Sequence, residues 1–296
     1  MNKNIKKLLP GVRKNVLLNS YSTFKIGGRA KYFFVATKKE DLIKAINTAK
    51  KIKSPFFILG QGSNLLISDK GFIGFVVRLQ VTGYRLKGNT IYAEAGVLLS
   101  RLVSLALENN LTGLEWAVGI PGTVGGAING NAGAFGQSMA EMVKEVEVYD
   151  VKNKKVRNLK NKNCKFSYRE SIFKNNKDLI IISANLRLKK GNKGKIKQKI
   201  KEYLKQRIKT QPLKLPSIGS IFKNPEGLFA GELIEKCGLK GKRIGDVKIS
   251  EKHANFIINL GKGKAKEVRK LITFIKKKVK ERFGITLEEE IQYLGF

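Results

Sequence analysis

The sequence predicts an α+β protein of about two domains. Short apolar runs alternate with segments of helical periodicity from Lys31 to about Lys190. The chain has 296 residues and 42% hydrophobic content, which is enough for a sizeable core. A lysine-rich stretch, LKKGNKGKIKQ at Leu188–Gln198, marks the best candidate domain boundary.

The first predicted domain covers residues 1–190, with a boundary between two subdomains near residues 75–80. Its strands are predicted from apolar and β-branched runs, and its helices from apolar residues at helical spacing. The expected strands are Phe56–Leu59, Phe75–Leu79, Thr90–Ala95, Val146–Val151 and Leu179–Leu188, and the expected helices are Asp41–Lys50 and Leu98–Asn109.

The second predicted domain covers residues 191–296 and is a smaller α+β unit. Two helices are expected from their apolar faces, one formed by Ile196, Ile200, Tyr203, Leu204 and Ile208, the other by Val268, Leu271, Ile272, Ile275 and Val279. The apolar run Phe256–Leu260 lies between them. A final strand is expected at Leu287–Leu294, where alternation would place Glu288, Glu290 and Gln292 opposite Leu287, Ile291 and Tyr293.

Composition excludes several classes of protein. The N-terminal residues lack the apolar run of a signal peptide, and no segment approaches 18 uninterrupted apolar residues, so we expect a soluble cytoplasmic protein with no membrane partner. Cys164 and Cys237 lie far apart without metal-ligand spacing. His253 is the only histidine, which excludes multi-histidine metal sites. We therefore expect no metal, and acid–base chemistry from Ser, Tyr, Lys, Arg or carboxylates.

The net charge of +36 raises the question of nucleic-acid binding. Only 12 of the 59 basic residues are Arg, and the lysines are scattered along nearly the whole chain. Nucleic-acid recognition favours Arg and localised patches. We therefore expect a lysine-biased surface and no nucleic-acid partner, although a positive field would favour anionic ligands.

Two glycine-rich segments predict a ligand site. The uncharged run GIPGTVGGAINGNAGAFG at Gly119–Gly136 interleaves apolar residues with glycines. We interpret it as a ligand-binding loop, with packed anchors between exposed backbone groups, and not as a flexible linker. GQGSNLL at Gly60–Leu66 follows an apolar strand and precedes another strand-like run, so it does not open a Rossmann helix. A strand-turn-strand whose amides, with Ser63 and Asn64, hold a pyrophosphate is expected; a simple tight turn is the alternative. Together the segments suggest a large, extended cofactor.

Six motifs, in order along the chain, give this sequence a specific resemblance to a known family. They are NSYSTFKIGG (Asn19–Gly28), the two glycine-rich segments, FSYRESIFK (Phe166–Lys174), PSIGSIFKNP (Pro216–Pro225) and LEEEIQYLG (Leu287–Gly295). Over residues 19–296 the chain resembles the UDP-N-acetylenolpyruvoylglucosamine reductase family of flavoenzymes in peptidoglycan precursor synthesis, in its shorter, type II form.

The resemblance implies an FAD-binding domain of the vanillyl-alcohol-oxidase type, made of two subdomains, followed by a small substrate-binding domain. It also implies non-covalent FAD, NADPH as hydride donor, and conversion of UDP-N-acetylglucosamine enolpyruvate to UDP-N-acetylmuramate. We expect a monomer or weak oligomer.

Three catalytic positions follow from the resemblance. Ser220 occupies the position of the proton donor, and Arg169 and Glu290 occupy those of partners acting on the substrate carboxylate and developing enolate. An arginine fork suits such charge, and a serine can protonate a strongly basic carbanionic centre. Glu290 would have to be protonated or paired with Arg169. Without the resemblance, the three would be interpreted as a turn residue, a surface cation and part of a solvated charge run.

Further contacts are expected around these positions. Lys223 is expected either to stabilise the serine alkoxide or to bind a UDP phosphate. Asn224 is expected to contact the substrate. The expected cofactor contacts are Gly60, Gln61, Gly62, Ser63, Asn64, Leu65, Gly119, Ile120, Pro121, Gly122, Thr123, Gly125, Gly126, Ala127, Gly130, Asn131, Ala132 and Gly133.

Two other functions stay open on the sequence. A flavin oxidase acting on an alcohol or sugar would use the same cofactor fold, but it would leave GSIFKNP unexplained. A basic nucleic-acid-binding protein would need no flavin.

Overall fold

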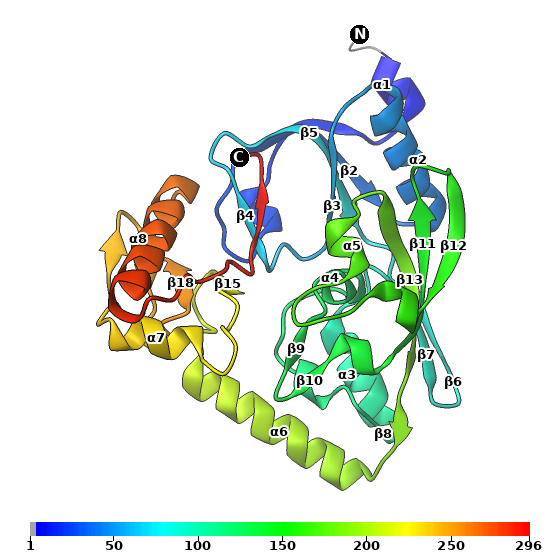
Figure 1. The fold of residues 1–296 in the computed structure, drawn as a ribbon. Coiled ribbons are helices and arrows are strands. Elements are labelled where there is room, and N and C mark those ends of the chain that lie inside the picture. Colours follow the sequence, from blue (N-terminus) through cyan, green and yellow to red (C-terminus); the bar gives the residue numbers. More distant parts are fainter. Residues whose placement is uncertain (1–3) are drawn as a thin grey trace. The chain divides into compact units, whose positions relative to one another are not determined.

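The computed structural model describes residues 4–296, which divide into two compact units (Figure 1). Unit 1 holds the described residues up to Arg13 together with 33–60 and 75–205, and unit 2 holds 14–32, 61–74 and 206–296. Strands β2 (Arg29–Ala36) and β5 (Phe72–Leu79) pass from one unit to the other. These units are discontinuous in sequence, whereas the boundary expected near residue 190 separates continuous segments and stays a prediction.

The main sheet of unit 1 has five strands in the order β12-β11-β13-β7-β6, and every neighbouring pair is antiparallel. Figure 1 shows β11, β12 and β13 side by side. The three strands predicted in this region are confirmed with small shifts at their ends. The bounds are β6 Tyr84–Lys87, β7 Thr90–Glu94, β11 Val143–Asp150, β12 Lys155–Lys160 and β13 Leu179–Arg187.

A second sheet has the order β1-β2-β5-β3, with β3 parallel to β5. Here β1 is Arg13–Leu17. Strand β3 is Phe56–Leu59, which agrees with the predicted strand. The helices of unit 1 are α1 Asn4–Leu8, α2 Lys39–Lys51, α3 Leu99–Glu108, α4 Val124–Asn129, α5 Ile172–Asn175 and the larger part of α6 Lys193–Thr210. Short 3₁₀ helices of the chain are η1 Asn19–Tyr21, η2 Glu115–Ala117, η3 Met139–Glu141 and η4 Asn161–Cys164.

The lysine-rich stretch at 188–198 is more ordered than its composition indicates. Lys189–Lys190 form strand β14, which pairs with β8 (Leu111–Thr112), and α6 already begins at Lys193. Within the stretch Ile196 is buried at 3% exposure, while the lysines of the helix start are exposed. Backbone pairing and one apolar anchor therefore order a segment whose side chains are solvated.

Unit 2 contains a four-stranded antiparallel sheet in the order β15-β18-β17-β16. Its strands are β15 Ser217–Ser220, β16 Arg243–Ile244, β17 Val247–Ile249 and β18 Phe256–Asn259, and its helices are α7 Ala230–Lys236 and α8 Ala265–Phe283. The predicted apolar face of α8 is confirmed: Val268, Leu271, Ile272, Ile275 and Val279 are all buried. They share one core with Phe222, Ile257 and Leu66.

The expected strand Leu287–Leu294 is largely wrong. Only β19 (Gln292–Leu294) is a strand, paired in parallel with β4 (Leu65–Ile67), and Glu289 makes an isolated bridge to Phe222. Leu287 and Ile291 are buried as expected, but Leu294 is buried and Tyr293 exposed. The alternation fails because different parts of this segment pair with different partners.

The N-terminus of α8 is held by a residue from another part of the chain. The Asp69 carboxylate accepts hydrogen bonds from the backbone N–H groups of Ala265 at 2.8 Å and Lys266 at 3.1 Å. These are two of the N–H groups that a helix leaves without an internal partner, and a negative charge there also complements the helix dipole. Asp69 therefore joins the loop after β4 to the helix that covers the sheet of unit 2.

Asp69→Ala is expected to lower the free energy of unfolding by about 1 to 2 kcal/mol, because both N–H groups lose their acceptor. Urea unfolding followed by circular dichroism measures this. Glu281→Gln is the matched control: Glu281 lies on α8 in an exposed ion pair with Lys278, which contributes little. Equal effects of the two substitutions would contradict the assigned role of Asp69.

Candidate active site

The first glycine-rich segment forms the predicted strand-turn-strand between β3 and β4. Gly62 has a φ of +64°, and a Cβ there would lie 2.4 Å from the Tyr21 carbonyl oxygen, so only glycine fits. The Gly62 carbonyl accepts from the Ser22 hydroxyl and the Thr23 N–H, each at 3.3 Å. The motif NSYSTFKIGG thus fixes the turn of the motif GQGSNLL.

The second glycine-rich segment contains a helix that its composition does not predict. Thr123 caps α4 by accepting a hydrogen bond from Gly126 N at 3.3 Å. Val124, Ala127 and Ile128 are buried, as expected of packed anchors. The interpretation of the whole run as a loop is therefore wrong in its centre, because burial of these side chains offsets the low helix propensity of glycine.

The two glycine-rich segments meet inside unit 1. A Cβ at Gly60 would lie 2.8 Å from the Thr123 hydroxyl oxygen, so the end of β3 packs closely against the cap of α4. Gly125 approaches Ala95 in the same way, with a Cβ–Cβ distance of 2.8 Å if it carried a side chain. These glycines serve the packing of the protein itself.

Gly126 and Gly130 are different from these packing glycines. Gly126 is exposed, and the nearest atom to a Cβ there is the Thr123 hydroxyl oxygen at 3.5 Å; at Gly130 it is the Gly126 carbonyl oxygen at 3.7 Å. Neighbouring protein atoms therefore do not require glycine at either position. Their bare backbone leaves a surface that a ligand can approach closely.

Thr123, whose hydroxyl lies next to Gly126, offers a backbone donor in the same unit. Thr123 and Leu98 form an antiparallel bridge in which the flanking groups bond, Leu99 N to Gly122 O and Val124 N to Val97 O. In such a pair the central N–H groups point away from the partner, so Thr123 N is directed outward. In unit 2, no hydrogen bond of the described residues engages the backbone N–H of Gln61, Gly62 or Ser63. In each unit, backbone amides without a protein acceptor suit an anionic dinucleotide such as FAD.

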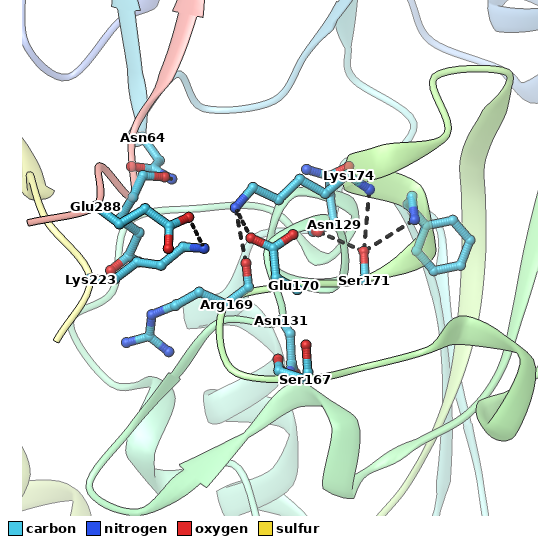
Figure 2. Close-up of polar contacts among 12 residues, drawn as sticks. Asn64, Asn129, Asn131, Ser167, Arg169, Glu170, Ser171, Lys174, Lys223 and Glu288 are labelled. Carbon is cyan, nitrogen blue, oxygen red and sulfur yellow. Dashed lines mark hydrogen bonds and ion pairs between the residues drawn. The ribbon is translucent and has the colours of Figure 1, made fainter. Parts of the chain in front are cut away.

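Arg169 is held against the end of the second glycine-rich segment, also in unit 1. Its guanidinium Nη2 donates to Gly133 O at 2.8 Å, and its backbone has a φ of +58°. The Lys174 ammonium donates to Arg169 O at 3.1 Å and pairs with Glu170 at 2.7 Å (Figure 2). A left-handed backbone at a non-glycine residue persists only where surrounding contacts hold it.

Two further contacts join the segment FSYRESIFK to α4 and the turn after it. The Ser171 hydroxyl caps α5 and donates to Asn129 O at 2.7 Å (Figure 2). The Asn131 carboxamide donates to Ser167 O at 2.7 Å. Asn131 therefore acts at least partly as a structural residue, which its sequence motif did not indicate.

Ser220 and Glu290 are brought together within unit 2. Glu290 N donates to the carbonyl of Ile221, the residue after Ser220, at 2.8 Å. Both residues are half-buried, and in the described residues no hydrogen bond engages the Ser220 hydroxyl. The Asn64 carboxamide donates to Glu290 O at 3.2 Å, so it is already used by the protein. The motifs GQGSNLL, GSIFKNP and LEEEIQYLG thus form one constellation.

Lys223 lies in the same constellation. Its ammonium pairs with Glu288 at 2.5 Å, and its side chain is only 11% exposed against 70% for Glu288 (Figure 2). Sequence reasoning missed this partner, because three consecutive glutamates are equivalent by composition. Asn224 accepts a hydrogen bond from Ala230 N at 3.1 Å, at the start of α7.

The structure distinguishes the three glutamates. Burial raises the pKa of the Glu289 carboxyl, but hydrogen bonds from Lys276 and Tyr293 and the nearby positive charges outweigh it, so its pKa lies below the ordinary value. Glu289 is thus a half-buried ion-pair member, Glu288 is the partner of Lys223, and Glu290 is held through its backbone.

The predicted site residues fall in both units. Arg169, Gly60 and the expected contacts in 119–133 belong to unit 1, whereas Ser220, Glu290, Lys223, Asn224 and the contacts in 61–65 belong to unit 2.

Two general features of residues 4–296 bear on function. They contain no group of three or more His, Cys, Asp or Glu side chains that could hold a metal ion. None of their helices is long and apolar enough to cross a membrane.

The single histidine of the sequence, His253, is a partner of the backbone. It accepts a hydrogen bond from Asn255 N, and burial lowers the pKa of its imidazole.

Comparisons with known proteins agree with these motifs. Residues 211–294 match the UDP-N-acetylenolpyruvoylglucosamine reductase C-terminal domain, and residues 30–159 match an FAD binding domain. A UDP-N-acetylenolpyruvoylglucosamine reductase of Caldanaerobacter subterraneus is 46% identical over 95% of this chain and 93% of its own length. One of Clostridium novyi is 40% identical over 100% of this chain and 96% of its own. The crystal structure of the Thermus caldophilus reductase superposes with a TM-score of 0.82 at 38% identity, covering 94% of this chain and 97% of that one.

Gly126→Ala is expected to weaken FAD binding about tenfold while leaving the fold intact or stabilising it by up to about 1 kcal/mol, because alanine favours the helix. Its methyl group would occupy the bare surface. Fluorescence titration of the apoprotein with FAD and urea unfolding measure the two effects.

Gly125→Ala is the matched control from the next position in α4. Its methyl group would meet Ala95, so it is expected to lower stability by about 1 to 3 kcal/mol. FAD binding by Gly126→Ala equal to that of the unmodified chain would show that no ligand lies against Gly126.

Proposed function

The chain belongs to the UDP-N-acetylenolpyruvoylglucosamine reductase family, and on this premise we propose that it reduces UDP-N-acetylglucosamine enolpyruvate to UDP-N-acetylmuramate, with NADPH as electron donor and non-covalently bound FAD. This is a step of peptidoglycan precursor synthesis. The observation that carries the proposal is the constellation of Ser220, Lys223 and Glu290, which hydrogen bonds assemble from two distant segments of unit 2.

The reaction adds a hydride and a proton across the carbon–carbon double bond of the enolpyruvyl group. Bound FAD, reduced by NADPH, supplies the hydride to the terminal carbon. The negative charge that develops on the adjacent carbon and carboxylate needs stabilisation and then a proton. The chain supplies both from its own residues.

Arg169 is assigned to the developing charge. Its guanidinium is permanently positive, its bond to Gly133 O orients it, and its planar fork of donors matches the geometry of a carboxylate. Fixed donors of this kind cost no reorganisation during the reaction.

Ser220 is assigned to proton delivery. A serine hydroxyl is a weak acid, but a carbanionic centre is a strong enough base to take its proton. The O–H bond of Ser220 breaks, a C–H bond forms on the substrate, and the alkoxide regains a proton from water. Lys223 stabilises either the alkoxide or a UDP phosphate after its ammonium has separated from Glu288. Separation of this ion pair costs little free energy because the Glu288 side chain is largely exposed.

Glu290 is assigned to the substrate side of the same constellation. Its backbone bonds to Ile221 and Asn64 set its position relative to Ser220. When protonated, a carboxyl beside a substrate carboxylate acts as a hydrogen-bond donor to it.

Purified enzyme is expected to be yellow and to oxidise NADPH much faster when UDP-N-acetylglucosamine enolpyruvate is present. Absorbance at the flavin and NADPH bands measures both. Colourless protein that cannot be reconstituted with FAD, or NADPH oxidation that ignores the enolpyruvyl sugar, would refute the proposal.

Ser220→Ala is expected to leave flavin reduction by NADPH near normal and to slow flavin reoxidation by the UDP-sugar roughly 10²- to 10⁴-fold, since only the second half-reaction needs the proton. Stopped-flow absorbance separates the two. Equal slowing of both half-reactions would mean that Ser220 serves the fold or the flavin.

The value of kcat/KM for the UDP-sugar is expected to fall as ionic strength rises, because a chain with net charge +36 attracts an anionic substrate. Steady-state rates in increasing salt test this. A kcat/KM that does not change with ionic strength would show that the lysines have no role in substrate capture.

A further inference from the structure

The Asn255 carboxamide makes two hydrogen bonds to the backbone of Phe222, two residues after Ser220. Phe222 N donates to Asn255 Oδ1 at 2.9 Å, and Asn255 Nδ2 donates to Phe222 O at 2.9 Å. The backbone carbonyl of Asn255 also accepts from Ile221 N at 2.9 Å. Asn255 is buried at 3% exposure, so these bonds form away from water.

The side chain of Asn255 acts where the strand pairing ends. Ser220 pairs with Phe256 in the β15–β18 ladder, after a register irregularity between Ser217 and Ser220. Phe222 lies beyond the last pair of that ladder, and the Asn255 carboxamide takes the place of a backbone partner there. A carboxamide is suited to this because it offers a donor and an acceptor side by side.

The opposite edge of the same segment is held by the glutamate run. Glu290 N donates to Ile221 O, and Lys223 N donates to Glu288 O, each at 2.8 Å. Residues 221–223 are therefore fixed from Asn255 on one side and from 288–290 on the other. A buried backbone group that loses its partner is costly, so loss of the Asn255 carboxamide would force this segment to move.

We propose that Asn255 is a positioning residue for proton delivery: its two bonds to Phe222 hold Ser220 and Glu290 in reactive alignment. This inference rests on the proposed function. The sequence did not single out Asn255, because nothing in EKHANF distinguishes it from a structural asparagine.

Asn259, the last residue of the strand β18 that Asn255 directly precedes, provides a matched control. It is buried at 1% exposure, and its carboxamide makes three backbone hydrogen bonds at 2.9 Å, donating to Phe24 O and accepting from Gly261 N and Gly263 N. None of these bonds reaches residues 220–223. Removal of the Asn259 carboxamide therefore breaks a comparable number of buried hydrogen bonds but leaves those of residues 220–223 in place.

The test compares the holoenzyme variants Asn255→Ala, Asn255→Asp and Asn259→Ala in both half-reactions. Asn255→Asp keeps the shape and the acceptor for Phe222 N, but its ionised form lacks the donor to Phe222 O. At saturating UDP-sugar, both Asn255 variants are expected to slow flavin reoxidation roughly 10- to 100-fold, because small misplacements of reacting groups cost this much. Flavin reduction by NADPH is expected to stay close to the wild-type rate, and Asn259→Ala to leave both half-reactions close to it.

Three results would overturn the inference: reoxidation at the wild-type rate in the Asn255 variants, equal slowing of both half-reactions, or a reoxidation defect of the same size in Asn259→Ala. Failure of both Asn255 variants to fold with flavin would make Asn255 a folding residue and would also overturn it. If wild-type flavin is not reoxidised by the UDP-sugar, the proposed function itself fails.

Discussion

The parallel pairing of β4 with β19 is the interaction on which the candidate site in unit 2 depends. It aligns Leu65–Ile67 with Gln292–Leu294, so the residues just before each strand become neighbours. Those residues are Asn64 and the glutamate run, and the bond from Asn64 to Glu290 O links positions 226 residues apart. A one-residue slip would turn Leu66 out of the core and move Glu290 away from Ile221.

Backbone groups, more than side chains, build this site. The segment 220–223 is held through its amides and carbonyls, and the turn at Gly62 through a carbonyl that Ser22 and Thr23 share. Such bonds position this segment without engaging the hydroxyl of Ser220. The turn also requires glycine at position 62, because Gly62 adopts a positive φ in a space that excludes a Cβ.

Local periodicity predicted elements wherever one neighbour dominates the environment. The helix α8 has a single buried face, and β3 is a short apolar run between turn residues, so both were predicted correctly. Prediction failed where a segment changes partners. Leu287–Leu294 bonds first to residues 221–223 and then to β4, and the glycine-rich run folds into α4 because three of its apolar residues are buried.

The sequence by itself determined the chemistry available to this protein. One histidine, uncharged glycine-rich segments and the motifs around Arg169, Ser220 and Glu290 define the family and the residue types that can act. Only the tertiary structure decided how those residues are used: which glutamate pairs with Lys223, which glycines serve packing and which leave the backbone bare, and that Asn255 completes a strand edge. The reason is that these distinctions depend on neighbours far away in sequence, which local patterns do not encode.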